Sequence, residues 1–196
     1  MRDPYGYDYA GDNPVNVPNA LSAARIALVP VLVWVLFAET PYDGSALAAT
    51  LFAIASITDV IDGHLARSRG LVTEVGKVLD PLADKLMVVS VLVSLAVLGQ
   101  MPAWAVVVIL GREVAVSVLR SRASKHGEVE VGARTLGKLK MGLQVLLVLV
   151  LLVAPDPAAG PVLALLYVTV AVTVVSGLDA ALAMRRKPSR WSSAAS

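Results

Sequence analysis

The sequence contains no cysteine, which excludes a disulfide framework, a thiol nucleophile and thiolate metal ligands. Charged residues are also scarce, at 16% of the chain, and the formal net charge is only +2. Because a nucleic-acid-binding protein needs a strongly basic surface, this balance argues against nucleic acid as a partner. The chain is rich instead in apolar residues, which make up 57% of its 196 positions. A soluble domain of this length rarely carries so many, so the composition predicts an integral membrane protein.

Six apolar segments follow one another along the chain, separated by short polar or proline- and glycine-containing stretches. Each has about the length that the core of a bilayer requires. We expect helices over residues 18–38, 46–67, 80–98, 103–120, 137–154 and 162–184. The expected fold is an all-α, six-transmembrane-helix bundle over residues 18–184, with a flexible or interfacial tail at 1–17 and a basic, serine-rich tail at 185–196.

Lysine and arginine are distributed unevenly among the connections between these segments. The stretches 39–45, 99–102 and 155–161 contain neither residue, whereas the alternate connections and the C-terminal end carry most of the cations. Because Lys and Arg favour the cytoplasmic side of a membrane, both termini are predicted to be cytoplasmic. The connection between the second and third segments is predicted to lie on the same side.

Four aspartates lie near that connection. Asp59 and Asp62 are three residues apart, and Asp80 and Asp84 are four apart, so each pair shares one face of a helix. Asp80 is also expected to cap the third segment, since Pro81 suits a first helical turn. If the aspartates only ended helices at the interface, four mutually repelling carboxylates would be costly there, whereas bound cations would neutralise them.

The chemistry of these side chains favours one kind of ligand. Carboxylate oxygens without sulfur favour Mg²⁺ or Mn²⁺ over zinc. Two such ions can clamp a pyrophosphate and stabilise a leaving phosphate, and a carboxylate beside them can accept a proton from an attacking hydroxyl. The spacing alone therefore predicts a metal-dependent phosphoryl-transfer site on the cytoplasmic side of a membrane bundle.

The stretch Asp59-x2-Asp62-Gly63-x2-Ala66-Arg67-x8-Gly76-x3-Asp80-x3-Asp84 resembles the signature of the CDP-alcohol phosphotransferases. The resemblance implies a six-helix membrane enzyme, commonly a homodimer. Such an enzyme transfers a substituted phosphate from a CDP-linked donor to an alcohol and releases CMP. Its general base would be Asp84, and its metal ligands would be Asp59, Asp62, Asp80 and Asp84. The residues expected to admit the CDP-linked lipid and meet its phosphates are Gly63, Ala66, Arg67 and Gly76.

A second cluster, of cations, follows in the fourth and fifth segments. Arg112 lies well inside an apolar run, where an unpaired charge is expensive. One interpretation is a structural ion pair of Arg112 with Glu113 or with an aspartate. The other is a pocket for the phosphate of an anionic acceptor, lined by Arg112, Arg120, Lys138 and Lys140.

Three further stretches are similar to the bacterial phosphatidylglycerophosphate synthases within that family. They begin at Pro18, Gly111 and Gly137, and read Pro18-Asn19-Ala-Leu-Ser-Ala-Ala-Arg25, Gly111-Arg112-Glu113 and Gly137-Lys138-x-Lys140-x3-Gln144. This resemblance implies CDP-diacylglycerol and sn-glycerol 3-phosphate as substrates, phosphatidylglycerophosphate and CMP as products, and a place in the cell membrane with the active site on the cytoplasmic side.

Two alternatives stay open from the sequence. Within the family, the acceptor could be that of a phosphatidylinositol phosphate synthase or of a cardiolipin synthase. Outside it, the aspartates could form the pore site of a divalent-cation transporter. The transporter is disfavoured because the far halves of the second and third segments, 46–54 and 88–98, are too apolar to line an ion path.

Overall fold

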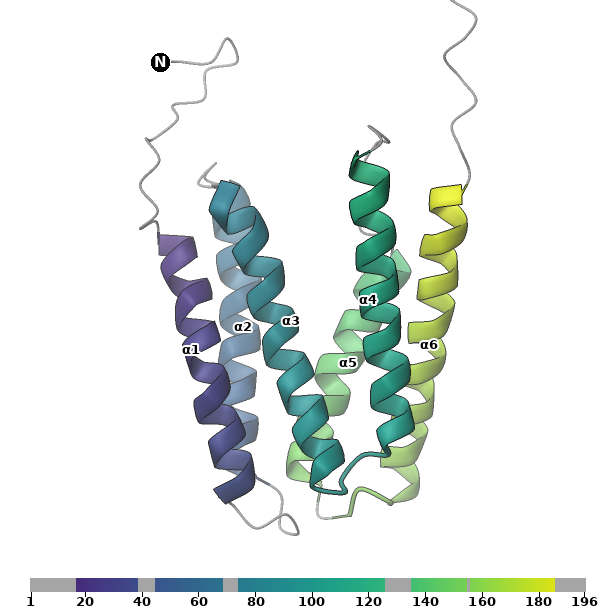
Figure 1. Ribbon diagram of the computed structural model, residues 1–196. Helices are drawn as coiled ribbons and strands as arrows, with labels where there is room; N and C mark the ends of the chain where they lie inside the picture. The colour runs from purple at the N-terminus through teal and green to yellow at the C-terminus, as the bar shows by residue number, and fades with distance from the viewer. Residues whose placement is uncertain (1–16, 39–44, 69–73, 126–134, 155, 186–196) are drawn as a thin grey trace, which may run out of the picture. The chain divides into compact units, whose positions relative to one another are not determined.

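The computed structural model describes residues 17–38, 45–68, 74–125, 135–154 and 156–185, and their side chains except at 17–19, 60–81, 122–125 and 184–185. These residues contain no strand and form six helices (Figure 1). The helices are α1 (Val17–Ala38), α2 (Ala46–Ser68), α3 (Glu74–Val97), α4 (Ala103–Lys125), α5 (Thr135–Val153) and α6 (Gly160–Arg185). The prediction of an all-α fold with six helices is therefore confirmed.

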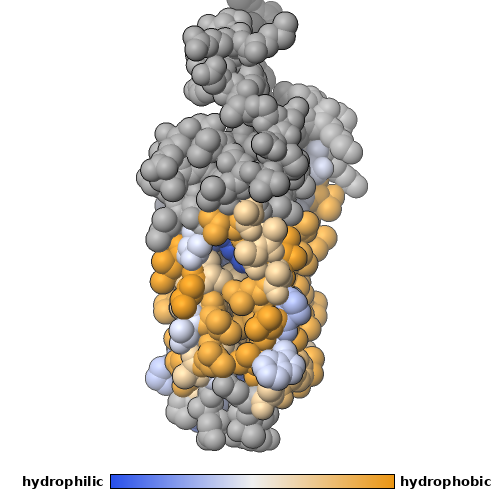
Figure 2. Space-filling view, turned by 90° about the vertical axis from the view of Figure 1, so that its left-hand side faces the viewer, coloured by the Kyte–Doolittle hydropathy of each residue, from blue (hydrophilic) through white to orange (hydrophobic). Residues whose placement is uncertain are grey.

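Within the described part of the chain, three helices are long and apolar enough to cross a membrane, over Ala20–Ala38, Thr135–Val153 and Gly160–Ala183. Large apolar side chains are also exposed on the described surface, among them Trp34, which is 70% exposed. Figure 2 shows one face of the molecule on which most of the described surface is hydrophobic. A surface of this kind is stable against lipid and not against water, so the protein is an all-α membrane protein.

The start of α3 differs from the expectation. The helix begins at Glu74, so Asp80 and Pro81 lie well inside it, and the prediction that Asp80 caps the third segment is wrong. The expected boundary followed the end of the apolar run, but polar residues continue a helix as readily as apolar ones. Proline removes a single backbone hydrogen bond, which a long helix can lose without ending. For the same reason α4 continues beyond Arg120, to Lys125.

The helices form two compact units. The first contains α1, α2, α3 and residues 148–153 of α5, and in it α1 packs against both α2 and α3. Its core includes the fully buried Leu32, Phe52 and Leu95. Ser45 begins α2 there: its Oγ accepts a hydrogen bond from the Ala48 N–H at 2.9 Å, as an N-cap does. The Ser45 N–H donates to the Leu152 carbonyl of α5 at 2.6 Å.

The second unit contains α4, residues 135–147 of α5, and α6. Here α4 packs against α6 around buried side chains that include Ile109 and Leu166. The turn between α3 and α4 was expected at 99–102 and is present, with Gly99 at a φ of 76°, a conformation that favours glycine. That residues 18–184 act as a single domain, with a tail on each side, stays a prediction.

Candidate functional site

The four aspartates of the signature lie on two helices of the first unit. Asp59 and Asp62 belong to α2, and Asp80 and Asp84 to α3, as the spacing predicted. The side chains of Asp59 and Asp84 are half-buried, whereas those of Asp62 and Asp80 lie outside the described residues. The same holds for the side chains of the residues expected to admit the CDP-linked lipid, Gly63, Ala66, Arg67 and Gly76.

Arg25 of α1 forms an ion pair with one member of this cluster. Its Nη1 lies 2.6 Å from Asp59 Oδ1, and the two side chains are 4% and 23% exposed. The contact is an ion pair and not a hydrogen bond, because the Nη1–H groups of Arg25 are not aligned with the Asp59 oxygen. Because a buried charge is costly unless it is compensated, the pair lets both residues lie inside an apolar helix bundle. Arg25 therefore joins α1 to the aspartate-bearing helix, a role that its position in the sequence did not reveal.

The donors that the structure describes here fit a hard divalent cation. Asp59 and Asp84 carry carboxylate oxygens, the type of ligand that hard divalent cations prefer. Among the described residues no group of three potential His, Cys, Asp or Glu ligands lies together, and the side chains of Asp62 and Asp80 are not among those residues. The metal-ligand roles of the four aspartates stay a prediction.

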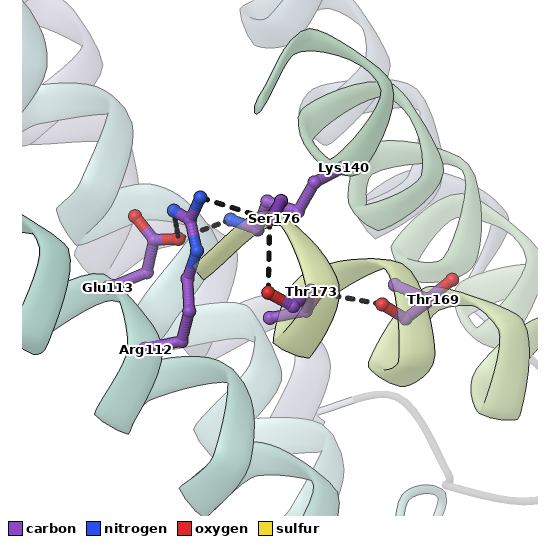
Figure 3. Close-up of polar contacts among 6 residues, drawn as sticks. All are labelled: Arg112, Glu113, Lys140, Thr169, Thr173 and Ser176. Carbon is purple, nitrogen blue, oxygen red and sulfur yellow. Dashed lines mark hydrogen bonds and ion pairs between the residues drawn. The ribbon is translucent and has the colours of Figure 1, made fainter. Parts of the chain in front are cut away.

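The second cluster is held by one carboxylate of α4. Glu113 Oε1 lies 3.0 Å from Arg112 Nη1 and 2.5 Å from Lys140 Nζ of α5 (Figure 3). The three side chains are largely buried, at 14%, 20% and 8% exposed for Arg112, Glu113 and Lys140. Two cations share one anion, so this group, the Arg112–Glu113–Lys140 triad, has a net charge of +1. The structural pair of Arg112 with Glu113 that the sequence left open is thus present.

The remaining two predicted phosphate ligands lie elsewhere on their helices. Arg120 and Lys138 are exposed. Lys138 and Lys140 are two residues apart, which places them on nearly opposite sides of α5. The structure therefore brings Arg112 and Lys140 together and leaves Arg120 and Lys138 at the surface of the described chain. Acceptor binding by any of the four stays a prediction.

A residue of α6 that the sequence analysis did not single out completes this cluster. Arg112 Nη2 donates to Ser176 Oγ at 3.0 Å, and Ser176 donates in turn to the Thr173 carbonyl at 3.0 Å. The available signal was a polar series in an apolar helix, with Thr169, Thr173 and Ser176 at i, i+4 and i+7, on one helix face. All three are buried.

Two buried polar atoms in this unit have no hydrogen-bond partner within the described residues. They are Arg112 Nε, a donor, and Gln144 Oε1, an acceptor. Gln144 lies four residues after Lys140, on the same face of α5. Because an unpaired buried polar group costs about 1–3 kcal/mol, both atoms are suited to meet a polar ligand.

Comparison with known proteins gives a consistent picture. The family model for CDP-alcohol phosphatidyltransferase matches residues 15–175. The chain is 43% identical to a CDP-diacylglycerol–glycerol-3-phosphate 3-phosphatidyltransferase of Bacillus subtilis, over 84% of this chain and 92% of the relative. It is 36% identical to a probable phosphatidylglycerophosphate synthase of Mycobacterium tuberculosis, over 84% of this chain and 79% of the relative. A CMP-forming cardiolipin synthase of Streptomyces coelicolor is 35% identical to the chain, over 65% of this chain and 60% of the relative.

The ion pair of Arg25 with Asp59 predicts energetic coupling between α1 and α2. We expect Arg25→Met and Asp59→Asn each to lower the free energy of unfolding by about 3 kcal/mol, because each leaves a partner uncompensated. The double variant should lose much less than the two losses added together, with a coupling of about 1–3 kcal/mol. Unfolding by SDS titration in mixed micelles, with chelator present, measures all three variants.

A matched control uses the same two substitutions at exposed positions, Arg120→Met and Asp156→Asn. Their effects should add to within about 0.5 kcal/mol. If the effects of Arg25→Met and Asp59→Asn were also additive, the pair would contribute no coupling and the assignment would be wrong.

Proposed function

Because the chain belongs to the CDP-alcohol phosphatidyltransferase family, we propose that it transfers the phosphatidyl group of CDP-diacylglycerol to sn-glycerol 3-phosphate. The products are phosphatidylglycerophosphate and CMP, as in phospholipid biosynthesis. The observation that carries the proposal is the match, over most of the chain, to relatives named for this reaction. As a family member the protein is an enzyme, and the transporter alternative is set aside.

The aspartates are the residues proposed to bind the CDP-linked donor. Asp59, Asp62, Asp80 and Asp84 would hold divalent ions, Mg²⁺ or Mn²⁺, which when bound neutralise the charge of the pyrophosphate and of the departing CMP. Gly63, Ala66 and Gly76 carry little or no side chain, so they would leave space for the nucleotide beside α2 and α3. Arg67 would add a positive charge for the phosphates.

Asp84 is the proposed general base. In the reaction the acceptor hydroxyl forms a bond to the β-phosphorus of CDP-diacylglycerol, the bond from that phosphorus to the CMP oxygen breaks, and the hydroxyl proton passes to the Asp84 carboxylate. Asp84 is half-buried in α3, one turn after Asp80. A carboxylate in this position can be kept from water and still meet an entering hydroxyl.

The Arg112–Glu113–Lys140 triad is the group proposed to bind the acceptor. Its net charge of +1 favours an acceptor that carries its own phosphate over a neutral alcohol. Glycerol 3-phosphate offers phosphate oxygens for the unpartnered Arg112 Nε and hydroxyl groups for Gln144 Oε1. The exposed Arg120 and Lys138 would raise the local concentration of the anion without fixing its position.

The proposed location follows from the substrates and from the distribution of cations. CDP-diacylglycerol is a membrane lipid and glycerol 3-phosphate is a charged, water-soluble molecule, so the site must lie at a membrane surface. We propose a multi-pass protein of the cell membrane, with both termini and the active site on the cytoplasmic side. A homodimer is proposed on the resemblance to the family alone.

A second candidate function has a specific observation in its favour. One matched relative is named as a CMP-forming cardiolipin synthase. Phosphatidylglycerol also carries a phosphate, with a single negative charge, and would be the acceptor in that case. Inositol 1-phosphate, the acceptor of the phosphatidylinositol phosphate synthases, is a phosphomonoester like glycerol 3-phosphate.

Product analysis decides among these acceptors. Purified protein in vesicles that contain labelled CDP-diacylglycerol is supplied separately with glycerol 3-phosphate, inositol 1-phosphate or phosphatidylglycerol, and the lipid product is identified by mass spectrometry. We expect CMP release and phosphatidylglycerophosphate with glycerol 3-phosphate. CMP release with inositol 1-phosphate or phosphatidylglycerol, and none with glycerol 3-phosphate, would overturn the proposed acceptor.

Asp84→Asn is expected to lower kcat by at least about a hundredfold, because it removes the proton acceptor and keeps an oxygen atom at the same position. Mn²⁺ binding, followed by electron paramagnetic resonance, should persist in the variant. Asp156→Asn removes an exposed carboxylate in the turn before α6 and serves as the matched control. Normal turnover by Asp84→Asn would exclude the role of general base.

Arg112→Ala is expected to raise the KM for glycerol 3-phosphate by about tenfold or more, with little change in the KM for CDP-diacylglycerol. Arg120→Ala should raise the KM for glycerol 3-phosphate less than Arg112→Ala does. The effect of Arg120→Ala should vanish at a salt concentration on the order of 0.5 M, which screens exposed charges. Initial rates of CMP release at low and high salt separate the two variants. Equal effects of Arg112→Ala on both KM values would show that Arg112 is only structural.

A further inference from the structure

Gly177 of α6 lies directly against the Arg112 side chain of α4. A Cβ atom built on Gly177 would be 2.8 Å from Arg112 Cγ, 3.6 Å from its Nε and 3.8 Å from its Cδ. The first separation is well inside the van der Waals contact distance of two carbon atoms, so any larger residue at 177 would displace Arg112. By contrast, a Cβ on Gly142 of α5 would meet nothing within 4 Å.

The same face of α6 carries a series of buried hydroxyl groups. Thr169 Oγ1 donates to the Leu165 carbonyl at 2.8 Å, and Thr173 Oγ1 donates to the Thr169 carbonyl at 2.7 Å. Both hydroxyls are thereby satisfied within their own helix, as is usual for threonine in an apolar environment. Ser176 donates to the Thr173 carbonyl and also accepts from Arg112 Nη2, so this hydroxyl links α6 to α4 (Figure 3).

Arg112 is therefore held on three sides. Its Nη1 pairs with Glu113, its Nη2 donates to Ser176, and its aliphatic stem fills the space that the missing side chain of Gly177 leaves. We propose that Ser176 and Gly177 are positioning residues of the acceptor site, which fix the place and direction of the Arg112 guanidinium. This inference rests on the proposed role of Arg112 in binding the acceptor phosphate.

The position of a guanidinium matters more than its charge alone. Arginine binds phosphate through paired N–H groups in one plane, and that geometry is lost if the group is turned or displaced. With Nη1 and Nη2 directed to protein partners, the unpartnered Nε and the remaining N–H groups have a defined direction for a ligand. Since α6 supplies one of these partners and the space for the stem, α6 takes part in acceptor recognition.

The experiment measures both Michaelis constants of the full-length enzyme in vesicles for Gly177→Ala and Ser176→Ala. Gly177→Ala should raise the KM for glycerol 3-phosphate by about tenfold, because the new methyl group displaces Arg112. Ser176→Ala, which only removes atoms, should raise it by about threefold to tenfold. The KM for CDP-diacylglycerol should change by less than about twofold in both, which also shows that the variants are folded.

Two control variants carry the same kinds of change elsewhere. Gly142→Ala adds a methyl group where nothing lies within 4 Å. Thr169→Val removes a buried hydroxyl that donates to the Leu165 carbonyl of its own helix. Both should leave the two KM values within about twofold of the wild type. If the controls raised the acceptor KM as much as Gly177→Ala and Ser176→Ala do, the proposed positioning role would be wrong.

An Arg112→Ala background tests whether α6 acts through Arg112. Ser176→Ala and Gly177→Ala should have no further effect on the acceptor KM there, whereas an independent structural effect would persist. A persistent effect, or unchanged acceptor KM in the single variants, would overturn the inference and leave the proposed function intact. If the wild type released no CMP with glycerol 3-phosphate, the proposed function would fail and this inference with it.

Discussion

The structure depends on how charged groups are compensated inside a protein made mostly of apolar helices. An uncompensated charge in such surroundings is expensive, so each buried cation needs an anion or a hydroxyl within the fold. In the first unit Arg25 of α1 pairs with Asp59 of α2. In the second unit Glu113 of α4 pairs with its neighbour Arg112 and with Lys140 of α5. The Arg25–Asp59 and Glu113–Lys140 contacts each join two helices and add to the register that side-chain packing sets. The charges that carry the proposed chemistry therefore also help to fix the helices that bear them.

Much of this could be predicted from the sequence. Spacing of three and four residues placed Asp59 with Asp62 and Asp80 with Asp84 on two helices, because helical periodicity is a local property. The end of an apolar run proved a poor guide to the end of a helix at α3 and α4, since helix formation does not require apolar residues. The same periodicity places Lys138 and Lys140 on nearly opposite sides of α5, and the structure has Lys138 exposed and Lys140 buried.

The partners of these groups could not be predicted, because they come from other helices. Nothing local to Arg25 indicates that it pairs with Asp59, and nothing local to Gly177 indicates that it adjoins Arg112. These contacts depend on the rotation and axial position of whole helices, which are fixed by the summed packing of many side chains. A glycine in a helix and a hydroxyl series in an apolar segment were visible in the sequence, but only as features without a partner.

The single carboxylate of the Arg112–Glu113–Lys140 triad explains how two buried cations can lie close together without a bound anion. Without Glu113, the two buried like charges would repel each other, and the empty site would be unstable. With a second carboxylate the site would be neutral and would attract a phosphate poorly. With one carboxylate the triad has a net charge of +1. This charge is small enough to be buried, and it would still favour binding of a phosphomonoester over a neutral alcohol. In the proposed acceptor site, preference for the anion would come from partial compensation: Glu113 neutralises one of the two cations, and the phosphate of the ligand would neutralise the other.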